Sequence, residues 1–221
     1  MKRIAYYGGS FDPVHRGHLA VATALVPLFA LDAFYFIPAF HAPHKPDSLP
    51  ASPFHRFAML SLCTAREPRI FVSPLELETS EKRYTVDTLR ELHEQNGDSE
   101  IYFVMGADSW LDITTWKEWE EVLTIVNHIV VSRPGYEVSF DHVTEQVRKR
   151  MIDIRNVSDS EKAIRIAAPL SQEKMIFITD AVDLPVSASS IRVDARDGQI
   201  DRPGDVSDEV AKYIEKYELY R

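Results

Sequence analysis

The stretch Gly8-Gly9-Ser10-Phe11-Asp12-Pro13-Val14-His15-Arg16-Gly17-His18 separates two segments with different hydrophobic patterns. A short β-like run, Arg3 to Tyr7, precedes it, and an apolar helical pattern, Leu19 to Leu31, follows it. A strand, a glycine turn and a helix start are the parts of many anion sites in α/β proteins, because a helix N-terminus offers unpaired N–H groups and partial positive charge. The stretch therefore predicts an α/β fold with an anion site near its beginning.

Two glycines and two histidines are the candidate anion-binding residues of this stretch. Gly8 and Gly9 lack a Cβ, so the backbone there can approach a ligand closely or adopt a positive φ. His15 and His18 lie three positions apart, which places both on one face of the first helical turn, within reach of the same anion. The pattern is not a Walker loop, because no Gly-Lys-Ser/Thr follows the glycines. It is not a clean GxGxxG fingerprint either.

Short apolar runs alternate with helical patterns along the chain. The strand-like runs are Ile4–Tyr7, Phe34–Ile37, Ile70–Ser73, Ile101–Met105, His128–Val131 and Met175–Ile178. The helical patterns are Leu19–Leu31, Phe54–Arg66, Val86–Glu94, Trp116–Thr124 and Val143–Ile152. This alternation predicts a doubly wound, mostly parallel Rossmann-like sheet with helices on both faces. Ligands of such sheets bind at the carboxyl ends of the strands, where the opening stretch lies.

We expect residues 1–221 to form one domain with two less regular parts. The charged segment 138–168 is poor in strand patterns and is predicted as a solvated helical excursion, its basic triplet 148–150 included. Residues 187–221 are predicted as a C-terminal helical part, which ends in a helix within Ser207 to Tyr220.

Composition excludes some classes of function. Lys and Arg number 25 and Asp and Glu 34, so the net charge is −9, which argues against nonspecific binding to nucleic acid. No apolar run approaches the roughly 20 residues that span a bilayer, and the start, Met1 to Ile4, enters a strand pattern without a signal-peptide core. A lone cysteine, Cys63, forms no internal disulfide, so we expect a cytoplasmic protein.

Two later segments are also predicted to bind anions. Pro43-His44-Lys45 lies in a proline-rich loop after a strand, where the lysine and histidine can close over a polyphosphate; the alternative is a surface loop with incidental charge. Ser187-Ala188-Ser189-Ser190-Ile191-Arg192 combines hydroxyls, a helix start and an arginine, and its alternative is an ordinary serine N-cap. Three such sites at strand ends rarely occur together by accident.

Taken together, these motifs resemble the bacterial nicotinate-mononucleotide adenylyltransferases, a branch of the nucleotidylyltransferase superfamily with the HxGH signature. The matching pieces, in the family's order, are GGSFDPVHRGH at 8–18, PHK at 43–45, RYTVDTL at 83–89, FVMGADSW at 103–110, SRPGY at 132–136 and SASSIR at 187–192. The related pantetheine-phosphate adenylyltransferases have threonine where this chain has His15. Ser10, Arg16 and Ala188 depart from the family's usual threonine, asparagine and hydroxyl residue.

The resemblance implies that the 5′-phosphate of nicotinate mononucleotide attacks the α-phosphate of ATP. The products are deamido-NAD (nicotinate adenine dinucleotide) and pyrophosphate, in NAD biosynthesis, and no covalent enzyme intermediate forms. Because both reactants are anions, such a reaction depends on positioning and charge neutralisation. Mg²⁺ is expected to arrive with ATP. A zinc site made of His15, His18, His41 and His44 is the alternative, but it lacks cysteines and the usual ligand spacings.

The resemblance also implies a role for each matching residue. The catalytic residues are His15, His18, Lys45 and Arg192. The ATP-binding residues are Gly8, Gly9, Ser10, Phe11, His44 and Ser189. The nicotinate mononucleotide-binding residues are Tyr84, Thr85, Asp108, Trp116 and Arg133.

Some of these residues have a structural alternative. N–H groups where Tyr84 and Thr85 open a helix favour a carboxylate over an amide, which would set acid-over-amide specificity by backbone alone. Trp116 either stacks on the pyridine ring or packs in the core, and Arg133 either pairs with the acceptor phosphate or lies exposed in a turn. Asp12 is expected to hold its own loop through backbone hydrogen bonds.

Two other functions stay open at this point. One is an adenylyltransferase that prefers nicotinamide mononucleotide or another nucleotide acceptor. The other is a nonenzymatic nucleotide-binding sensor of the same fold, against which the intact set His15, His18, Lys45 and Arg192 argues. The sequence leaves the oligomeric state and the strength of the acid preference open.

Overall fold

The structure is a computed structural model that describes residues 1–40, 50–78, 83–132, 138–168, 173–182, 184, 186–198 and 204–221. Within these ranges seven strands form one sheet in the order β3-β2-β1-β4-β5-β7-β6. The strands are β1 (Lys2–Gly9), β2 (Ala33–Pro38), β3 (Ile70–Val72), β4 (Ser99–Gly106), β5 (Asn127–Val131), β6 (Met151–Asp153) and β7 (Ile176–Thr179). Each neighbouring pair is parallel, so the predicted sheet is confirmed.

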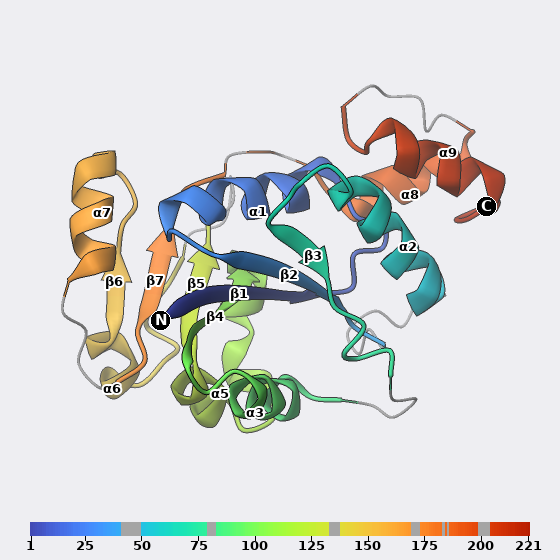
Figure 1. Cartoon of the computed structure of the whole chain (residues 1–221). Coiled ribbons are helices and arrows are strands. Elements are labelled where there is room, and N and C mark those ends of the chain that lie inside the picture. Colours follow the sequence, from blue (N-terminus) through green and yellow to red (C-terminus); the bar gives the residue numbers. More distant parts are fainter. Residues whose placement is uncertain are drawn as a thin grey trace.

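Helices cover both faces of the sheet (Figure 1). One face packs against α1 (Arg16–Leu28), α2 (Pro53–Thr64), α7 (Asp159–Ala167), α8 (Ala188–Arg196) and α9 (Asp208–Lys216). The other packs against α3 (Thr85–Gln95), α4 (Ala107–Leu111), the 3₁₀ turn η1 (Ile113–Thr115), α5 (Trp119–Ile125) and α6 (Glu145–Lys149). The central strands are buried on both sides, which explains why their sequences are continuously apolar.

The chain order reverses between β1 and β4. From β1 the chain continues to β2 and β3 on one side, and β4 then begins the other half of the sheet. The two strands run in register, with Tyr7 opposite Val104, and end at Gly9 and Gly106. Such a reversal is where doubly wound sheets bind ligands, so the opening stretch lies at the expected place.

The prediction for residues 138–168 needs a correction. The helix expected over Val143 to Ile152 forms only as α6, which ends at Lys149, and Met151 begins the edge strand β6 instead. Arg150 is buried rather than solvated, and its Nη1 donates to the carbonyls of Leu123 (2.7 Å) and Lys174 (3.0 Å). These bonds hold the chain beside the sheet and end the helix there.

A helix that spans a membrane must be both long and apolar. Among the residues described, none of the helices combines the length and apolarity needed to span a bilayer.

A buried arginine fixes the segments at the carboxyl ends of β1 and β2. Arg56 of α2 is fully buried, and its guanidinium donates to the carbonyls of Ser10 (2.6 Å), Ala39 (2.7 Å) and Ala51 (3.0 Å). Burial lowers the pKa of Arg56, and the negative charge of Asp12 opposes that shift. One side chain thus joins the loop after β1, the segment after β2 and the residue before α2.

We expect Arg56→Lys to lower the free energy of unfolding by about 3 kcal/mol, because an ammonium on a shorter stem cannot reach three carbonyls in different directions. The measurement is chemical denaturation at equilibrium. Arg66→Lys is the matched control, since that side chain is 90% exposed, and it should change stability by less than about 0.5 kcal/mol. Equal stability of the two variants would contradict this role of Arg56.

Candidate functional site

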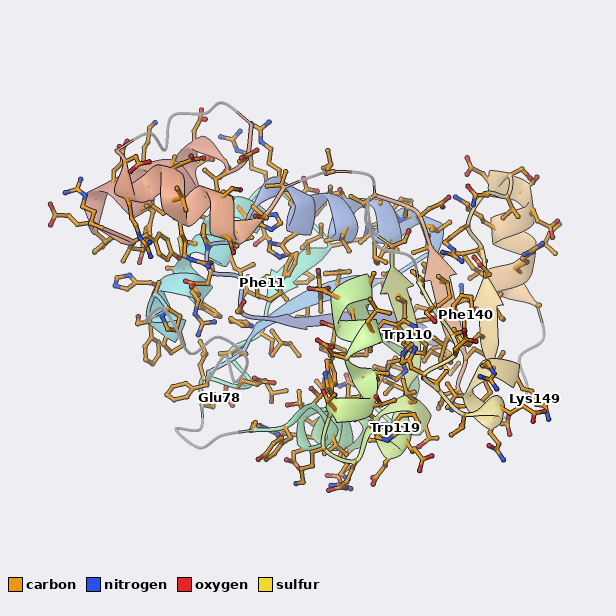
Figure 2. The ribbon with its side chains drawn as sticks, turned by 180° about the vertical axis from the view of Figure 1, so that it is seen from behind. Phe11, Glu78, Trp110, Trp119, Phe140 and Lys149 are labelled. Atoms are coloured by element: carbon orange, nitrogen blue, oxygen red, sulfur yellow. The ribbon has the colours of Figure 1, made fainter. Side chains whose placement is uncertain are left out.

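The loop after β1 owes its shape to close packing of aromatic rings. A Cβ at Gly9 would lie 2.9 Å from the ring of Phe11, and one at Gly8 would lie 3.2 Å from the ring of Phe103. The positive φ of this loop occurs at Phe11 (48°), whereas neither glycine has one. Phe11 is buried in the core on one face of the sheet, and Trp110 is buried on the other (Figure 2). The glycines are therefore needed for packing in the structure itself.

His15 and His18 form a stacked pair at the start of α1. His15 is the N-cap residue, with extended backbone, and its ring lies parallel to that of His18 at a centroid distance of 3.7 Å. A Cβ at Gly17 would lie 3.0 Å from the His15 ring, so the glycine between the histidines makes room for the stack. Both imidazoles thus meet at a helix N-terminus, where the helix dipole favours an anion.

One hydrogen bond defines the chemistry of His18. The backbone N–H of His15 donates to Nδ1 of His18 at 3.2 Å. A nitrogen that accepts a hydrogen bond carries no proton, so the neutral ring of His18 holds its proton on Nε2. Nε2–H is then a hydrogen-bond donor of the kind that binds a phosphate oxygen.

The third predicted anion segment lies against the same loop. Nη1 of Arg192 donates to the carbonyl of Asp12 at 2.7 Å, and Nη2 donates to the hydroxyl of Ser189 at 3.3 Å. Ser187 caps α8, because its hydroxyl accepts from the N–H of Ser190 at 3.2 Å. The structure therefore brings Arg192 and Ser189 to the end of β1, and Ser187 also fulfils the ordinary capping role.

A small cavity opens beside His15 at the carboxyl ends of three central strands. Its walls come from β1, β4, β5, the start of α1 and the segment after β7. They are formed by Tyr7, His15, Gly17, Val21, Gly106, Val131, Ser132, Val182, Leu184 and Val186. Five of the ten lining residues are valine or leucine, and the others are Tyr7, His15, Ser132 and the two glycines. With a volume of about 20 Å³ the cavity has room for about one water molecule, so it does not hold a flat ring in this arrangement.

Two of the predicted acceptor residues, Tyr84 and Thr85, form the start of α3. Tyr84 is the N-cap of α3, has extended backbone, and does not cap the helix with its side chain. The backbone bonds of the first turn begin at the N–H of Asp87, which donates to the carbonyl of Tyr84 at 3.0 Å. Thr85 and Val86 therefore lie where a helix presents N–H groups without intrahelical acceptors. Nζ of Lys117 lies 4.8 Å from the centre of the Tyr84 ring, which places the segment after η1 beside this terminus.

Trp110, Trp116 and Asp108 differ in how far their side chains are buried. Trp110 is fully buried, and its Nε1 donates to the carbonyl of Ser139, so its role is packing. Trp116 is half-buried against the core, so part of its ring stays accessible. Asp108 is exposed in the first turn of α4, with Oδ1 close over Gly106, at the carboxyl end of β4.

Three predicted residues, His44, Lys45 and Arg133, lie outside the described residues, as does His41 of the alternative zinc site. Their roles stay predictions. Within the described ranges, no group of three or more His, Cys, Asp or Glu side chains is arranged to hold a metal ion.

Sequence reasoning missed Arg56 and the long-range partners of Asp12. Arg56 had a usable signal, since it lies three and four positions before Met59 and Leu60 on the apolar face of α2. Asp12 is expected to bond within its own loop, whereas its Oδ1 accepts from the N–H of Ala51, 39 positions away, at 3.1 Å. It also accepts from the hydroxyl of Tyr220 at 2.8 Å, a contact with no sequence signal.

Comparisons with known proteins identify the family of the chain. The family model described as cytidylyltransferase-like matches residues 6–193. A nicotinate-nucleotide adenylyltransferase of Mycobacterium sp. (strain KMS) is 40% identical over 146 residues, 66% of this chain and 72% of the relative. One of Mycolicibacterium vanbaalenii is 33% identical over 187 residues, 82% of this chain and 87% of the relative.

Solved structures support the fold. The nicotinic acid mononucleotide adenylyltransferase of Plasmodium falciparum, complexed with NaAD, superposes with a TM-score of 0.70 at 20% identity, covering 100% of this chain and 98% of that one. The chain therefore belongs to the cytidylyltransferase-like family and, within it, to the nicotinate-nucleotide adenylyltransferases, which are nucleotidyltransferase enzymes of NAD biosynthesis.

Proposed function

We propose that the protein transfers the adenylyl group of ATP to nicotinate mononucleotide, forming deamido-NAD and pyrophosphate. The observation that carries the proposal is the stacked pair of His15 and His18 at the N-terminus of α1, where the sheet order reverses. The hydrogen bond from the His15 N–H to Nδ1 of His18 leaves the proton of a neutral His18 on Nε2. Such a donor suits the charge that grows on an α-phosphate during transfer.

ATP is the substrate that fits this end of the sheet. In the proposal its adenine lies beside Gly106, where the cavity of about 20 Å³ has to widen to admit the ring, and its phosphates follow the loop of Gly8 to Phe11 toward the start of α1. Arg192 and Ser189 contact the β- and γ-phosphates from one side, and His44 and Lys45 from the other. Mg²⁺, bound to the nucleotide, neutralises part of the phosphate charge.

The chemical step needs no protein base. The second pKa of a phosphate monoester is about 6, so the acceptor phosphate is already a nucleophile at neutral pH. One of its oxygens forms a bond to the α-phosphorus while the bond to the bridging oxygen of the β-phosphate breaks, and pyrophosphate leaves with that electron pair. His15 and His18 hold the α-phosphate and stabilise its charge, so catalysis rests on alignment and electrostatics.

The acceptor lies on the side of α3 in this proposal. N–H groups at Thr85 and Val86 bind the nicotinate carboxylate, and the accessible part of the Trp116 ring stacks on the pyridine. Asp108 accepts a hydrogen bond from a ribose hydroxyl, and Arg133 pairs with the phosphate. An amide would direct its own NH₂ at these N–H groups, which disfavours nicotinamide mononucleotide.

We also propose a cytoplasmic location for the protein. A cytoplasmic location follows from the lone Cys63 and from the metabolic role of the family. An amide-preferring transferase and a nonenzymatic nucleotide sensor are the alternatives that the assays below separate.

We expect His18→Asn to lower kcat about 10²- to 10³-fold, the usual cost of removing one donor to a developing charge. The short asparagine amide can still accept from the His15 N–H, but it has no atom at the position of Nε2. The measurement is pyrophosphate release with ATP, Mg²⁺ and nicotinate mononucleotide, and the wild type is assayed in parallel with nicotinamide mononucleotide.

His93→Asn is the control for this variant, because His93 is exposed in the last turn of α3, away from the stacked pair. Rapid wild-type release with the amide and little with the acid would support the amide-preferring alternative. No release with either acceptor, while ATP still binds, would overturn the transferase and leave a sensor.

We expect Thr85→Pro to reduce the preference for acid over amide by roughly tenfold or more, because it deletes an N–H that binds the carboxylate. Proline is tolerated at the first position of a helix, and Tyr84 already has the extended backbone (φ −103°, ψ 153°) that must precede it. The measurement is the ratio of kcat/KM for the two acceptors.

Two controls isolate that backbone N–H. Thr85→Val removes only the hydroxyl and should keep the preference. Asp159→Pro places proline at the first position of α7, after an extended Ser158, and should leave the ratio unchanged. A Thr85→Pro enzyme with wild-type preference would show that another part of the site recognises the carboxylate.

A further inference from the structure

The penultimate residue of the chain contacts the loop after β1. The hydroxyl of Tyr220 donates to Oδ1 of Asp12 at 2.8 Å, across 208 positions of sequence. Burial, followed by the charge of Asp12, raises the pKa of Tyr220, so the phenol stays protonated and keeps donating at neutral pH. The family resemblance assigns no role to this tyrosine.

The C-terminal segment is built to bring Tyr220 to this position. In α9, Val210 and Ile214 are buried, and the helix packs against α2. After α9 the N–H of Leu219 returns to the carbonyl of Ile214 at 3.1 Å. Tyr220 itself has a φ of 69°, which is a left-handed conformation. This conformation is unfavourable for any residue with a Cβ, so it persists where surrounding contacts stabilise it. Figure 1 shows the chain end beside α8 and α9.

Asp12 is a carboxylate whose charge needs compensation. Its side chain is nearly buried, and Oδ1 accepts from both the Tyr220 hydroxyl and the N–H of Ala51. The guanidinium of Arg192 is close by, with Nη1 2.7 Å from the carbonyl of Asp12 but 3.9 Å from its Oδ2. Arg192 thus holds the backbone of the loop and stays at the outer limit of an ion pair with the carboxylate.

Removing the phenol hydroxyl would change that balance. A buried carboxylate that loses a donor attracts the nearest cation more strongly. Arg56 also interacts with Asp12 through its charge, but its guanidinium is held by the carbonyls of Ser10, Ala39 and Ala51. Arg192 is the cation at the edge of the carboxylate, and a shift toward Oδ2 would release the loop carbonyl and turn the guanidinium away from the substrate phosphates. The Tyr220 hydroxyl therefore gives the Asp12 carboxylate a hydrogen bond that Arg192 would otherwise have to provide.

We infer that Tyr220 is a positioning residue for adenylyl transfer, which acts through Asp12 to keep Arg192 and residues 10–13 in their reactive arrangement. This inference rests on the proposed function, since it names a further residue of the same site.

The test is Tyr220→Phe, with kcat and KM measured for ATP and for nicotinate mononucleotide. We expect kcat to fall roughly 10- to 100-fold, as for other small misplacements of catalytic groups, while KM for the acceptor stays within about twofold. Tyr213→Phe is the matched control. Its hydroxyl, on the same C-terminal segment, bonds to Nδ1 of His55 at 2.9 Å rather than to the loop, so kcat should not change.

A double-mutant cycle with Asp12→Asn separates positioning from stability. If Tyr220 acts through the charge of Asp12, the double variant should be more active than Tyr220→Phe alone, and within about twofold of Asp12→Asn. Because the neutral amide no longer attracts Arg192, the same comparison decides the question if Tyr220→Phe alone folds poorly. Thermal unfolding of all four proteins accompanies the kinetics.

A Tyr220→Phe enzyme with wild-type kcat would overturn the inference, as would losses that simply multiply in the double variant. A wild-type protein that releases no pyrophosphate would refute the proposed function instead, so the two failures are distinguishable.

Discussion

The segments at the carboxyl ends of β1 and β2 depend on hydrogen bonds from the guanidinium of Arg56. This guanidinium is fully buried and donates to the carbonyls of Ser10, Ala39 and Ala51, which belong to three separate segments of the chain. A buried charge is tolerated only when its hydrogen-bonding groups are satisfied, so the cation and the three carbonyls require one another. The loop that leads to His15 starts from this fixed point, and Arg192 takes a second carbonyl of it, at Asp12.

The same contacts explain how an acidic chain can offer a site for two anions. The net charge is −9, yet the end of β1 gathers Arg56, Arg192 and the N-termini of α1 and α8. Asp12 is the acidic member of this group, and Ala51, Tyr220 and the edge of Arg192 surround it. A local positive field of this kind serves charge neutralisation in phosphoryl chemistry, whereas the acidic remainder disfavours nucleic acid.

Much of the fold could be predicted because its strands are short, apolar and separated by helices, which is the pattern of a sheet buried on both faces. The edge strand β6 could not, since Met151–Asp153 is too short to show a period and follows a helix directly. His15 and His18 could be placed from their spacing at a helix start. Tyr220 could not, because a contact across 208 positions depends on how α9 docks against α2. Arg56 lies between these cases, as a charged residue on an apolar helical face.

The central claim is that the α-phosphate of ATP binds between the loop after β1 and the stacked histidines. A crystal structure with Mg²⁺ and α,β-methylene ATP tests it most directly. We expect the α-phosphate within about 3 Å of an imidazole nitrogen of His15 or His18, and the adenine beside Gly106. A triphosphate bound away from both histidines would contradict it.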